Sequence, residues 1–299
     1  MSAAPPSAPA APCKWPAGPA RITSLLRGRP LRVCASPQPG PKSIPPSSSQ
    51  TYLCEDGFIA WIDFTAVAQP SLRVVNFGSL LETPVAPTEV VTLFGVALGP
   101  DTPATLQLDS SNRITTVLSV TRVVFDGVAA PLIRVDSGQI TAIVPNSVAG
   151  KTHSLVAVEH NAQTTASTMV VIGVASFALL TFDPAGTGPC AAINLDGTLN
   201  SASTPAPAGS IVSLFLIGSG ASSQTDGAVA TEASSLSPAP IVVVGTQLAK
   251  VLYAGPSPGS TAALTQINIR LPSSASGQLL VFVLANGFSS QFGATLSVK

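Results

Sequence analysis

From Leu72 onward, short runs of β-branched and aromatic residues alternate with clusters of Gly, Pro, Asn and Asp. Apolar runs of about four to eight residues that end at turn formers are typical of buried strands in a β sandwich. Val90–Phe94, for example, follows Pro84 and Pro87 and is closed by Gly95. In this half of the region, the pattern predicts strands at Val90–Phe94, Val123–Phe125, Pro131–Val135, Gln139–Val144, Ser154–Val158 and Thr168–Val174.

The second half of the chain repeats the pattern of the first, with matching positions roughly 120 residues apart. The corresponding segments are Ile211–Phe215 and Val90–Phe94, Ile241–Gly245 and Val123–Gly127, Gln266–Asn268 and Gln139–Thr141, and Leu280–Leu284 and Leu155–Glu159. Within the copies, Leu252–Pro272 and its counterpart Leu132–Pro145 each read as a strand, a loop and a second strand that is stopped by a Pro. We therefore expect an all-β fold with two tandem Ig-like sandwiches that meet near residues 173–176.

Dipeptides that favour positive φ mark the tight turns. Asp126-Gly127 predicts a two-residue type I′ hairpin after Val123–Phe125, and Asn286-Gly287 corresponds to Asn161-Ala162 in the first copy. Asp196-Gly197 predicts a further hairpin at the entry to the second copy.

Four segments follow from composition and pattern. Residues 1–50 hold 12 of the 28 prolines together with Ser-rich runs, so they are predicted to be a disordered, basic head. Residues 51–70 read as a linker or an edge strand. Residues 71–174 and 175–299 are the two predicted sandwiches.

Charge and hydropathy exclude several classes of function. Residues 51–299 carry 14 acidic against eight basic residues, a net charge of −6, which argues against nucleic-acid binding. No apolar stretch reaches the ~18 residues of a membrane-spanning helix, and residues 1–20 lack the apolar region of a secretory signal. With only 9% charged residues, little helix is expected.

Several of these segments carry a family resemblance: Pro87–Gly99 (PTEVVTLFGVALG), Val124–Pro145, Asn194–Ser201 (NLDGTLNS), Gly209–Gly220, Val251–Pro272 and Phe282–Val298. Together they resemble the C-terminal module of a family of secreted acidobacterial proteins, whose two halves are similar to IPT/TIG domains. The resemblance implies an accessory module without catalytic residues, located extracellularly or in the cell envelope. The chain departs from the family in its missing signal sequence and in its Pro-rich head.

Three motifs suggest chemistry but have simpler explanations. Gly255–Gly259 matches the GxSxG pattern of serine hydrolases, yet Pro258 follows Ser257 and has no N–H for an oxyanion hole, so a rigid loop is expected. His153 and His160 lie at the two ends of one predicted strand and have no evident third metal ligand. Oxygen-bearing residues alternate from Asn194 to Asn200, but the Gly and Glu of a calcium loop are missing, which favours a hydrogen-bonded turn.

The cysteines and aromatic residues leave two questions open. Cys54 and Cys190 either form a disulfide or remain unpaired, and their spacing fits no metal site. Trp15 and Trp61 precede the sandwiches, and Tyr253 is expected to pack inward or at the domain junction. The Phe residues that end apolar runs are expected in the core, namely Phe94, Phe125, Phe215 and Phe282.

Taken together, these features predict no catalytic, cofactor-binding or metal-binding residue and no enzyme activity. We expect a non-catalytic structural or adhesive accessory module of an exported or cell-envelope protein. The alternative is a carbohydrate-binding module that uses loops at one end of a sandwich. For either role, the expected partners of the chain are other domains, proteins or glycans at the cell surface. Nucleic acid is not an expected partner.

Overall fold

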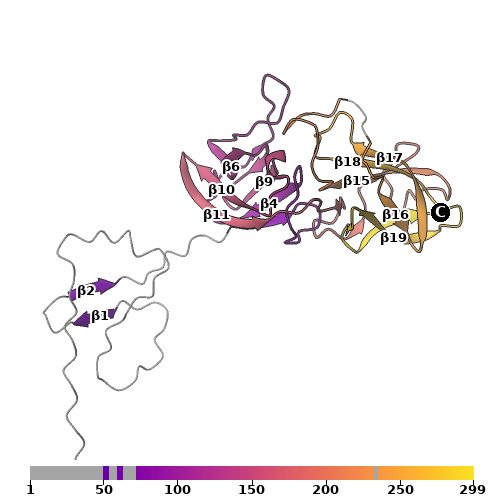
Figure 1. The fold of residues 1–299 in the computed structure, drawn as a ribbon. Coiled ribbons are helices and arrows are strands. Elements are labelled where there is room, and N and C mark those ends of the chain that lie inside the picture. The colour runs from indigo at the N-terminus through magenta and orange to yellow at the C-terminus, as the bar shows by residue number, and fades with distance from the viewer. Residues whose placement is uncertain (1–49, 54–58, 63–71, 232–234) are drawn as a thin grey trace, which may run out of the picture. The chain divides into compact units, whose positions relative to one another are not determined.

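The structure, a computed structural model, describes residues 50–53, 59–62, 72–231 and 235–299 (Figure 1). The predicted disordered head lies almost entirely outside these residues. In the described part, the only helical element is a short 3₁₀ turn at Asn146–Val148, which confirms the predicted all-β class. None of these residues forms a helix that could cross a membrane.

The chain divides into two compact units, residues 1–65 and 66–299. Within the first, β1 (Gln50–Leu53) and β2 (Ile59–Ile62) pair only with each other in an antiparallel sheet. The second unit contains both sandwiches.

The first sandwich has a five-stranded sheet in the order β3-β4-β9-β8-β5 and a four-stranded sheet in the order β11-β10-β6-β7. Its strands are β3 (Arg73–Asn76), β4 (Val90–Phe94), β5 (Ala104–Thr105), β6 (Thr121–Phe125), β7 (Val128–Ala129), β8 (Leu132–Val135), β9 (Gln139–Ile143), β10 (His153–His160) and β11 (Gln163–Val171). The predicted segments all coincide with strands, although the last strand, β11, begins five residues earlier than predicted.

In the second sandwich, the strands form one hydrogen-bonded path, β12-β15-β18-β17-β16-β19-β21-β13, with β14 and β20 as side branches. Its strands are β12 (Ala178–Leu179), β13 (Gly188–Pro189), β14 (Ala192–Asn194), β15 (Ile211–Ile217), β16 (Ile241–Val244), β17 (Gln247–Pro256), β18 (Thr265–Arg270), β19 (Gly277–Ala285), β20 (Phe288–Ser289) and β21 (Ala294–Val298). The path is continuous because β17 and β19 are long and each pairs with two strands. β17 pairs with β16 through its first residues and with β18 through the rest, and β19 pairs with β21 through its first residues and with β16 through later ones. A strand that bends in this way joins the two layers of a sandwich.

Strand register confirms the tandem repeat. Leu93 of β4 faces Ile140 of β9, and their counterparts Leu214 and Ile267 face each other in β15 and β18. Both copies also carry the same β-bulge, between Leu132 and Arg134 in β8 and between Val251 and Tyr253 in β17. A bulge disrupts the ladder locally. Its recurrence at the same place shows that these two strand pairs have the same backbone pairing in both copies.

The predicted hairpin turns are present. Phe125 and Val128 are paired across Asp126 and Gly127, whose φ angles are 48° and 86°. Asn286 and Gly287, at 52° and 81°, join β19 to β20 in the same way. Positive φ at both central residues defines the type I′ turn, whose twist matches that of the strands it joins.

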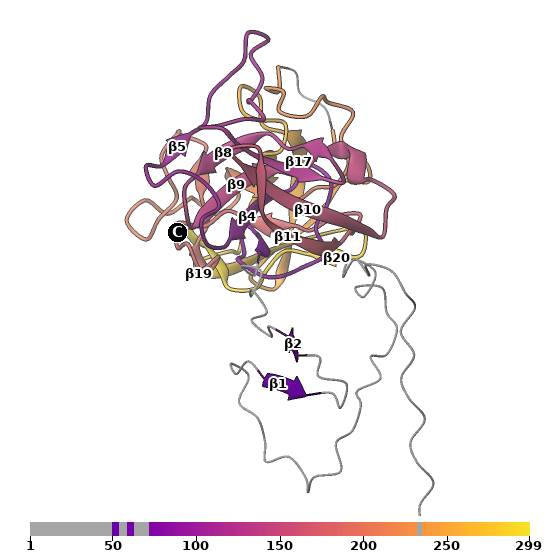
Figure 2. The same cartoon turned by 90° about the vertical axis from the view of Figure 1, so that its left-hand side faces the viewer.

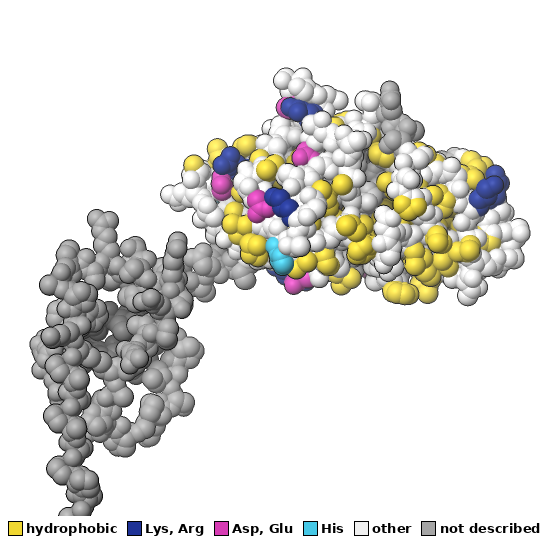
Figure 3. Space-filling view, in the orientation of Figure 1, with side chains coloured by type: hydrophobic (Ala, Val, Ile, Leu, Met, Phe, Trp, Pro, Cys, Tyr) yellow, Lys and Arg dark blue, Asp and Glu magenta, His cyan; other side chains and the backbone are white. Residues whose placement is uncertain are grey.

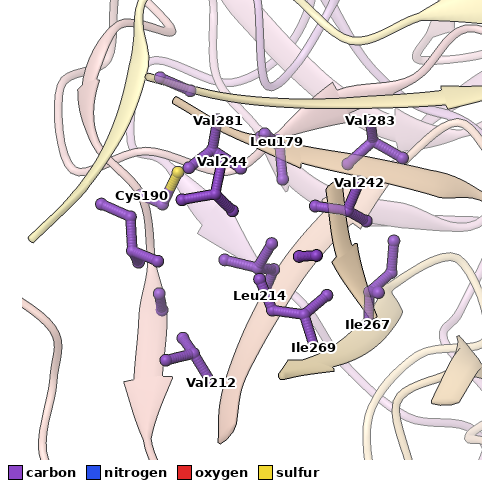
Figure 4. Close-up of a cluster of buried hydrophobic side chains, with 14 of the residues drawn as sticks. Leu179, Cys190, Val212, Leu214, Val242, Val244, Ile267, Ile269, Val281 and Val283 are labelled. Carbon is purple, nitrogen blue, oxygen red and sulfur yellow. The ribbon is translucent and has the colours of Figure 1, made fainter. Parts of the chain in front are cut away.

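Each sandwich has its own hydrophobic core. Figure 4 shows the second, in which Leu214 of β15 and Ile267 of β18 face the valine side chains of β16 and β19. Of the four Phe expected in the core, only Phe125 is fully buried; Phe94, Phe215 and Phe282 are half-buried. The prediction failed for these three because neighbouring residues in a strand point to opposite faces, and Leu93, Leu214 and Val281 occupy the inward positions.

Candidate functional site at the junction of the two sandwiches

A buried carboxyl group lies where the chain passes from one sandwich to the other. Glu89, just before β4, is fully buried. Its carboxylate accepts hydrogen bonds from Asn76 Nδ2 at 2.8 Å, from the Ala86 N–H at 2.6 Å and from Ser176 Oγ at 3.2 Å. Asn76 Nδ2 also donates to the Ser176 carbonyl at 2.9 Å. These residues tie the first sandwich to the segment that enters the second.

Burial controls the ionisation of this group. Removal from water raises the pKa of Glu89 from 4.5 to about 8, and the three hydrogen bonds to its oxygens counteract only part of that rise. Among the residues that the structure describes, no basic side chain bonds to the carboxylate; its partners are an amide, a hydroxyl and a backbone N–H. At neutral pH, Glu89 is therefore largely protonated.

Further contacts join the two sandwiches. Asn146 Nδ2 donates to Asp226 Oδ1 at 3.0 Å, and the Asn146 N–H donates to the same oxygen at 2.9 Å. Thr88 Oγ1 donates to the Gly220 carbonyl at 2.7 Å. A small apolar cluster contains buried residues from both sandwiches, namely Val90, Ile114, Ile143, Ala178, Ile217 and Ala263. The two sandwiches, which lie side by side in Figure 1 and one in front of the other in Figure 2, therefore share a packed interface.

An open groove of about 510 Å³ lies beside this junction and is called the junction groove below. Its lining comes from the β3–β4 connection, the segment between the sandwiches, the β12–β13 loop and the β20–β21 region. The lining residues are Ser79, Leu81, Thr83, Pro84, Ala175, Ser176, Phe177, Ala185, Gly186, Thr187, Phe288, Ser289, Ser290, Gln291 and Phe292. All fifteen are uncharged at neutral pH.

Three aromatic rings line the groove, and two of them are exposed. Phe292 is 75% exposed and Phe288 is 36% exposed, whereas Phe177 is buried. The Phe292 ring packs against Phe282 with the ring centres 5.9 Å apart and the planes tilted by 34°. Gln291 fixes the backbone between Phe288 and Phe292: its side-chain oxygen accepts from the Leu179 N–H, and its nitrogen donates to the Leu179 carbonyl, at 2.9 and 2.7 Å.

Charged side chains concentrate elsewhere. All five ion pairs of the described residues join residues of the first sandwich. In Figure 3, acidic and basic side chains are scattered mainly over that sandwich, while hydrophobic and uncharged atoms prevail over most of the second. Residues 175–299 contain only three Lys or Arg and four Asp or Glu. The junction groove therefore lies beside the second sandwich, which is the less charged of the two.

The residues singled out from the sequence do not converge on one place. Ser257 is buried, and its hydroxyl donates to Gln266 Oε1 at 3.2 Å. Gly255 and Pro256 end strand β17, so only the rest of the GPSPG segment forms a turn, and the expected loop is shorter than predicted. His160 Nδ1 lies 2.7 Å from Thr121 Oγ1, and His153 Nδ1 lies 3.1 Å from Thr152 Oγ1.

Turn geometry accounts for the Asn194–Asn200 segment. Asp196 Oδ1 accepts from both the N–H and the hydroxyl of Thr198, and Asn200 Nδ2 donates to Asn194 Oδ1. Ile193 and Leu199 form an antiparallel bridge across the predicted hairpin. These polar side chains satisfy one another, and across residues 50–53, 59–62, 72–231 and 235–299 no three His, Cys, Asp or Glu side chains gather as a metal site would require.

Cys190 is a buried free thiol, and burial raises its pKa from 9.0 to about 12. Cys54, Trp15 and the side chain of Trp61 lie outside the described residues. The Tyr253 hydroxyl donates to the Pro256 carbonyl at 2.7 Å, within its own strand.

Sequence reasoning missed the two features that matter most at the junction. Glu89 is an acidic residue beside an apolar run, and only its position next to the Pro87-Thr88 turn hinted at an unusual environment. Phe288 and Phe292 come directly after the Asn286-Gly287 turn. Two aromatic residues so close to a turn could have been noted as exposed.

Comparison with known proteins adds little. No family model and no curated protein matches this chain. Among solved structures, the chain is similar to the plexin A4 full extracellular region, with 12% identity over 82% of this chain and 20% of that chain and a TM-score of 0.26. It is also similar to SGBP-B of the Bacteroides ovatus mixed-linkage glucan utilization locus, in complex with a mixed-linkage heptasaccharide, with 12% identity over 73% of this chain and 44% of that chain and a TM-score of 0.27.

The chain thus spans less than half the length of either protein. At these TM-scores, the likenesses carry no conclusion about this chain. The resemblance to the acidobacterial family and to IPT/TIG repeats stays a prediction.

Proposed function

We propose that residues 72–299 are a non-catalytic structural or adhesive accessory module of an exported or cell-envelope protein. The observation that carries this proposal is the shared interface between the sandwiches. A flexible tether between two independent domains needs no buried polar contacts, whereas a module that holds its neighbours at a fixed spacing does. Here the Glu89, Asn76 and Ser176 contacts, together with the apolar cluster, hold the two copies in one arrangement.

Two further features support a role without chemistry. The polar residues with unusual environments, Glu89 and Cys190, are buried in packed regions and do not line the junction groove. The groups that do line it are hydroxyls, an amide, aliphatic side chains and aromatic rings, none of which is a general base at neutral pH. The surface is also poor in charge, which suits an extracellular module that contacts uncharged material.

The fixed arrangement is tested by pulsed electron spin resonance on the full chain. Spin labels are introduced through unnatural amino acids at Val128 and Leu248, which are exposed on the first and second sandwich. We expect one narrow distance distribution, and a broader one when Asn76 is replaced by Ala. A broad distribution in the unmodified chain would argue against a spacer or scaffold role.

Location is tested separately. Antibodies against the module, applied to fractions of the source cells, are expected to detect it in the envelope or the medium. Detection in the cytosol alone would contradict the assignment to an exported protein.

Carbohydrate binding is the second candidate function, and the exposed Phe292 and Phe288 rings favour it. Phe288 begins the short strand β20, and Phe292 lies in the loop between β20 and β21, the kind of element that the sequence suggested for this alternative.

A further inference from the structure

We propose that the junction groove binds a segment of a neutral polysaccharide, with Phe292 and Phe288 as the stacking surface for its sugar rings. This inference deepens the carbohydrate-binding candidate and rests on it. It names the site, the residues and the class of ligand.

The first argument is the chemistry of the lining. Six of the fifteen lining residues carry hydroxyl groups, and none carries a charge. A charged ligand would lose hydration in the groove without gaining an opposite charge. A neutral sugar instead offers hydroxyls for hydrogen bonding and apolar C–H faces for contact with rings, so it matches both kinds of surface in the groove.

The second argument is the exposure of the rings. Phe292 leaves three quarters of its surface in water, although burying a Phe side chain is worth about 1.5–3 kcal/mol. Its contact with Phe282 limits the orientations that the ring adopts. Phe292 also shares the groove lining with Phe288, Phe177 and Leu81, and a contiguous apolar patch of this kind is typical of a binding site.

The third argument comes from the internal repeat. Asn161-Ala162 and Asn286-Gly287 form the same two-residue turn, followed by QTTAS in the first copy and FSSQF in the second. Gln163 thus corresponds to Phe288. Beyond Ser289 the second copy leaves the strand, so Phe292 has no counterpart in β11. Because the first copy builds the same turn without any aromatic residue, the turn does not require a ring at position 288. The presence of that ring in the second copy alone, beside the groove, indicates a role in contact with another molecule.

The fourth argument concerns which polar groups remain available. An extended peptide needs donors and acceptors for its backbone, and the one long amide of the groove, Gln291, is already bonded to Leu179 and Gly186. Ser289 and Thr187 are exposed, and among the described residues their hydroxyls have no hydrogen-bond partner. Each hydroxyl both donates and accepts, so it can pair with a sugar hydroxyl, which does the same.

Affinity electrophoresis of the full chain tests the inference. Native gels contain dextran, hydroxyethylcellulose, galactomannan or xylan as neutral probes, and polygalacturonate as an anionic probe. We expect at least one neutral polymer to retard the protein and polygalacturonate to have no effect. Phe292→Ala should weaken the retardation about tenfold, because it removes the main stacking surface. Phe288→Ala should have a smaller effect in the same direction.

Phe182→Ala is the matched control, since this Phe is 55% exposed but does not line the groove, and its retardation should equal that of the unmodified chain. Circular dichroism melting of each variant shows whether it is folded. The inference is overturned if no neutral polymer retards the chain or if folded Phe292→Ala is retarded as strongly as the unmodified chain.

These outcomes are independent of the structural role. If the spin-label distances are narrow and no polymer binds, the spacer role stands and the saccharide site falls. If a polymer binds in a Phe292-dependent way while the spin-label distance distribution is broad, the saccharide site stands and the spacer role falls.

Discussion

The side-chain amide of Asn76 donates to the carboxylate of Glu89 at 2.8 Å and to the carbonyl of Ser176 at 2.9 Å. Asn76 and Glu89 belong to the first sandwich, and Ser176 lies 100 residues further along the chain, in the segment that enters the second. A single buried amide thus connects a titratable group to the junction, so the ionisation of Glu89 bears on how firmly the two sandwiches are held together.

We predict that stability falls as pH rises from about 4.5 to about 8. The pKa of Glu89 is about 8 in the folded protein and near 4.5 when exposed, so the folded state holds the proton more tightly than the unfolded state. The stabilisation is complete below 4.5 and is lost as pH rises through 8. By linkage, the loss is on the order of 3–5 kcal/mol. Chemical denaturation at a series of pH values measures it.

Glu89→Gln provides the control for that prediction. At pH 5 Glu89 is protonated, but its hydroxyl oxygen keeps a lone pair that can accept a hydrogen bond, whereas the NH₂ group of Gln has none, so the variant should be less stable than the unmodified chain at that pH. At pH 9, it should be the more stable of the two because it carries no buried charge. Parallel stability curves that never cross would show that Glu89 does not titrate in this range.

Asn76→Ala should lower the free energy of unfolding by about 2–4 kcal/mol. The substitution leaves the Ser176 carbonyl, part of the Glu89 carboxylate and the N–H groups of Gly78 and Ser79 without their partner. Gln163→Ala, at an exposed position in the first sandwich, should change it by less than about 0.5 kcal/mol. Equal urea midpoints for the two variants would contradict the role given to Asn76.

Gly218→Ala and Gly127→Ala should differ sharply. Both glycines have positive φ, 78° and 86°, so both substitutions strain the backbone by about 1 kcal/mol. A Cβ at Gly218 would lie 1.9 Å from the Ser176 carbonyl oxygen, whereas one at Gly127 would meet nothing within 4 Å. We expect a loss above about 3 kcal/mol for Gly218→Ala and about 1 kcal/mol for Gly127→Ala by calorimetry. Similar losses would mean that the contact at Ser176 relaxes easily.

Cys190 should resist alkylation in the folded protein. Burial raises the pKa of its thiol to about 12, so at pH 8 the reactive thiolate is about a thousandfold rarer than for a thiol with the ordinary value of 9.0. Peptide mass spectrometry after iodoacetamide treatment, with and without guanidinium, measures the reaction at this residue. Rapid labelling of Cys190 without denaturant would show that β13 and β21 open readily around it.

Much of the fold could be predicted because its signals are local. The run Val90–Phe94 coincides with β4, and the Asp126-Gly127 turn forms as expected, since β-branched residues favour extended backbone and Asp-Gly tolerates positive φ. The duplication was readable for the same reason, because both copies use similar local signals at matching intervals. The burial of Phe94, Phe215 and Phe282 was predicted wrongly, since apolar character alone does not decide which face of a strand a side chain occupies.

The candidate site could not be read from the chain in this way. Glu89 acquires its environment from Asn76 and Ser176, and the groove gathers residues 79, 81, 83, 84, 175–177, 185–187 and 288–292 from both sandwiches. The sequence by itself determined the strands, the turns and their repetition, which depend on neighbouring residues. Only the tertiary structure decided that a carboxyl is buried at the junction and that two Phe rings stay in water. The environment of Glu89 depends on packing between segments that are distant in the sequence, since Ser176 lies 87 positions from Glu89 and 100 from Asn76.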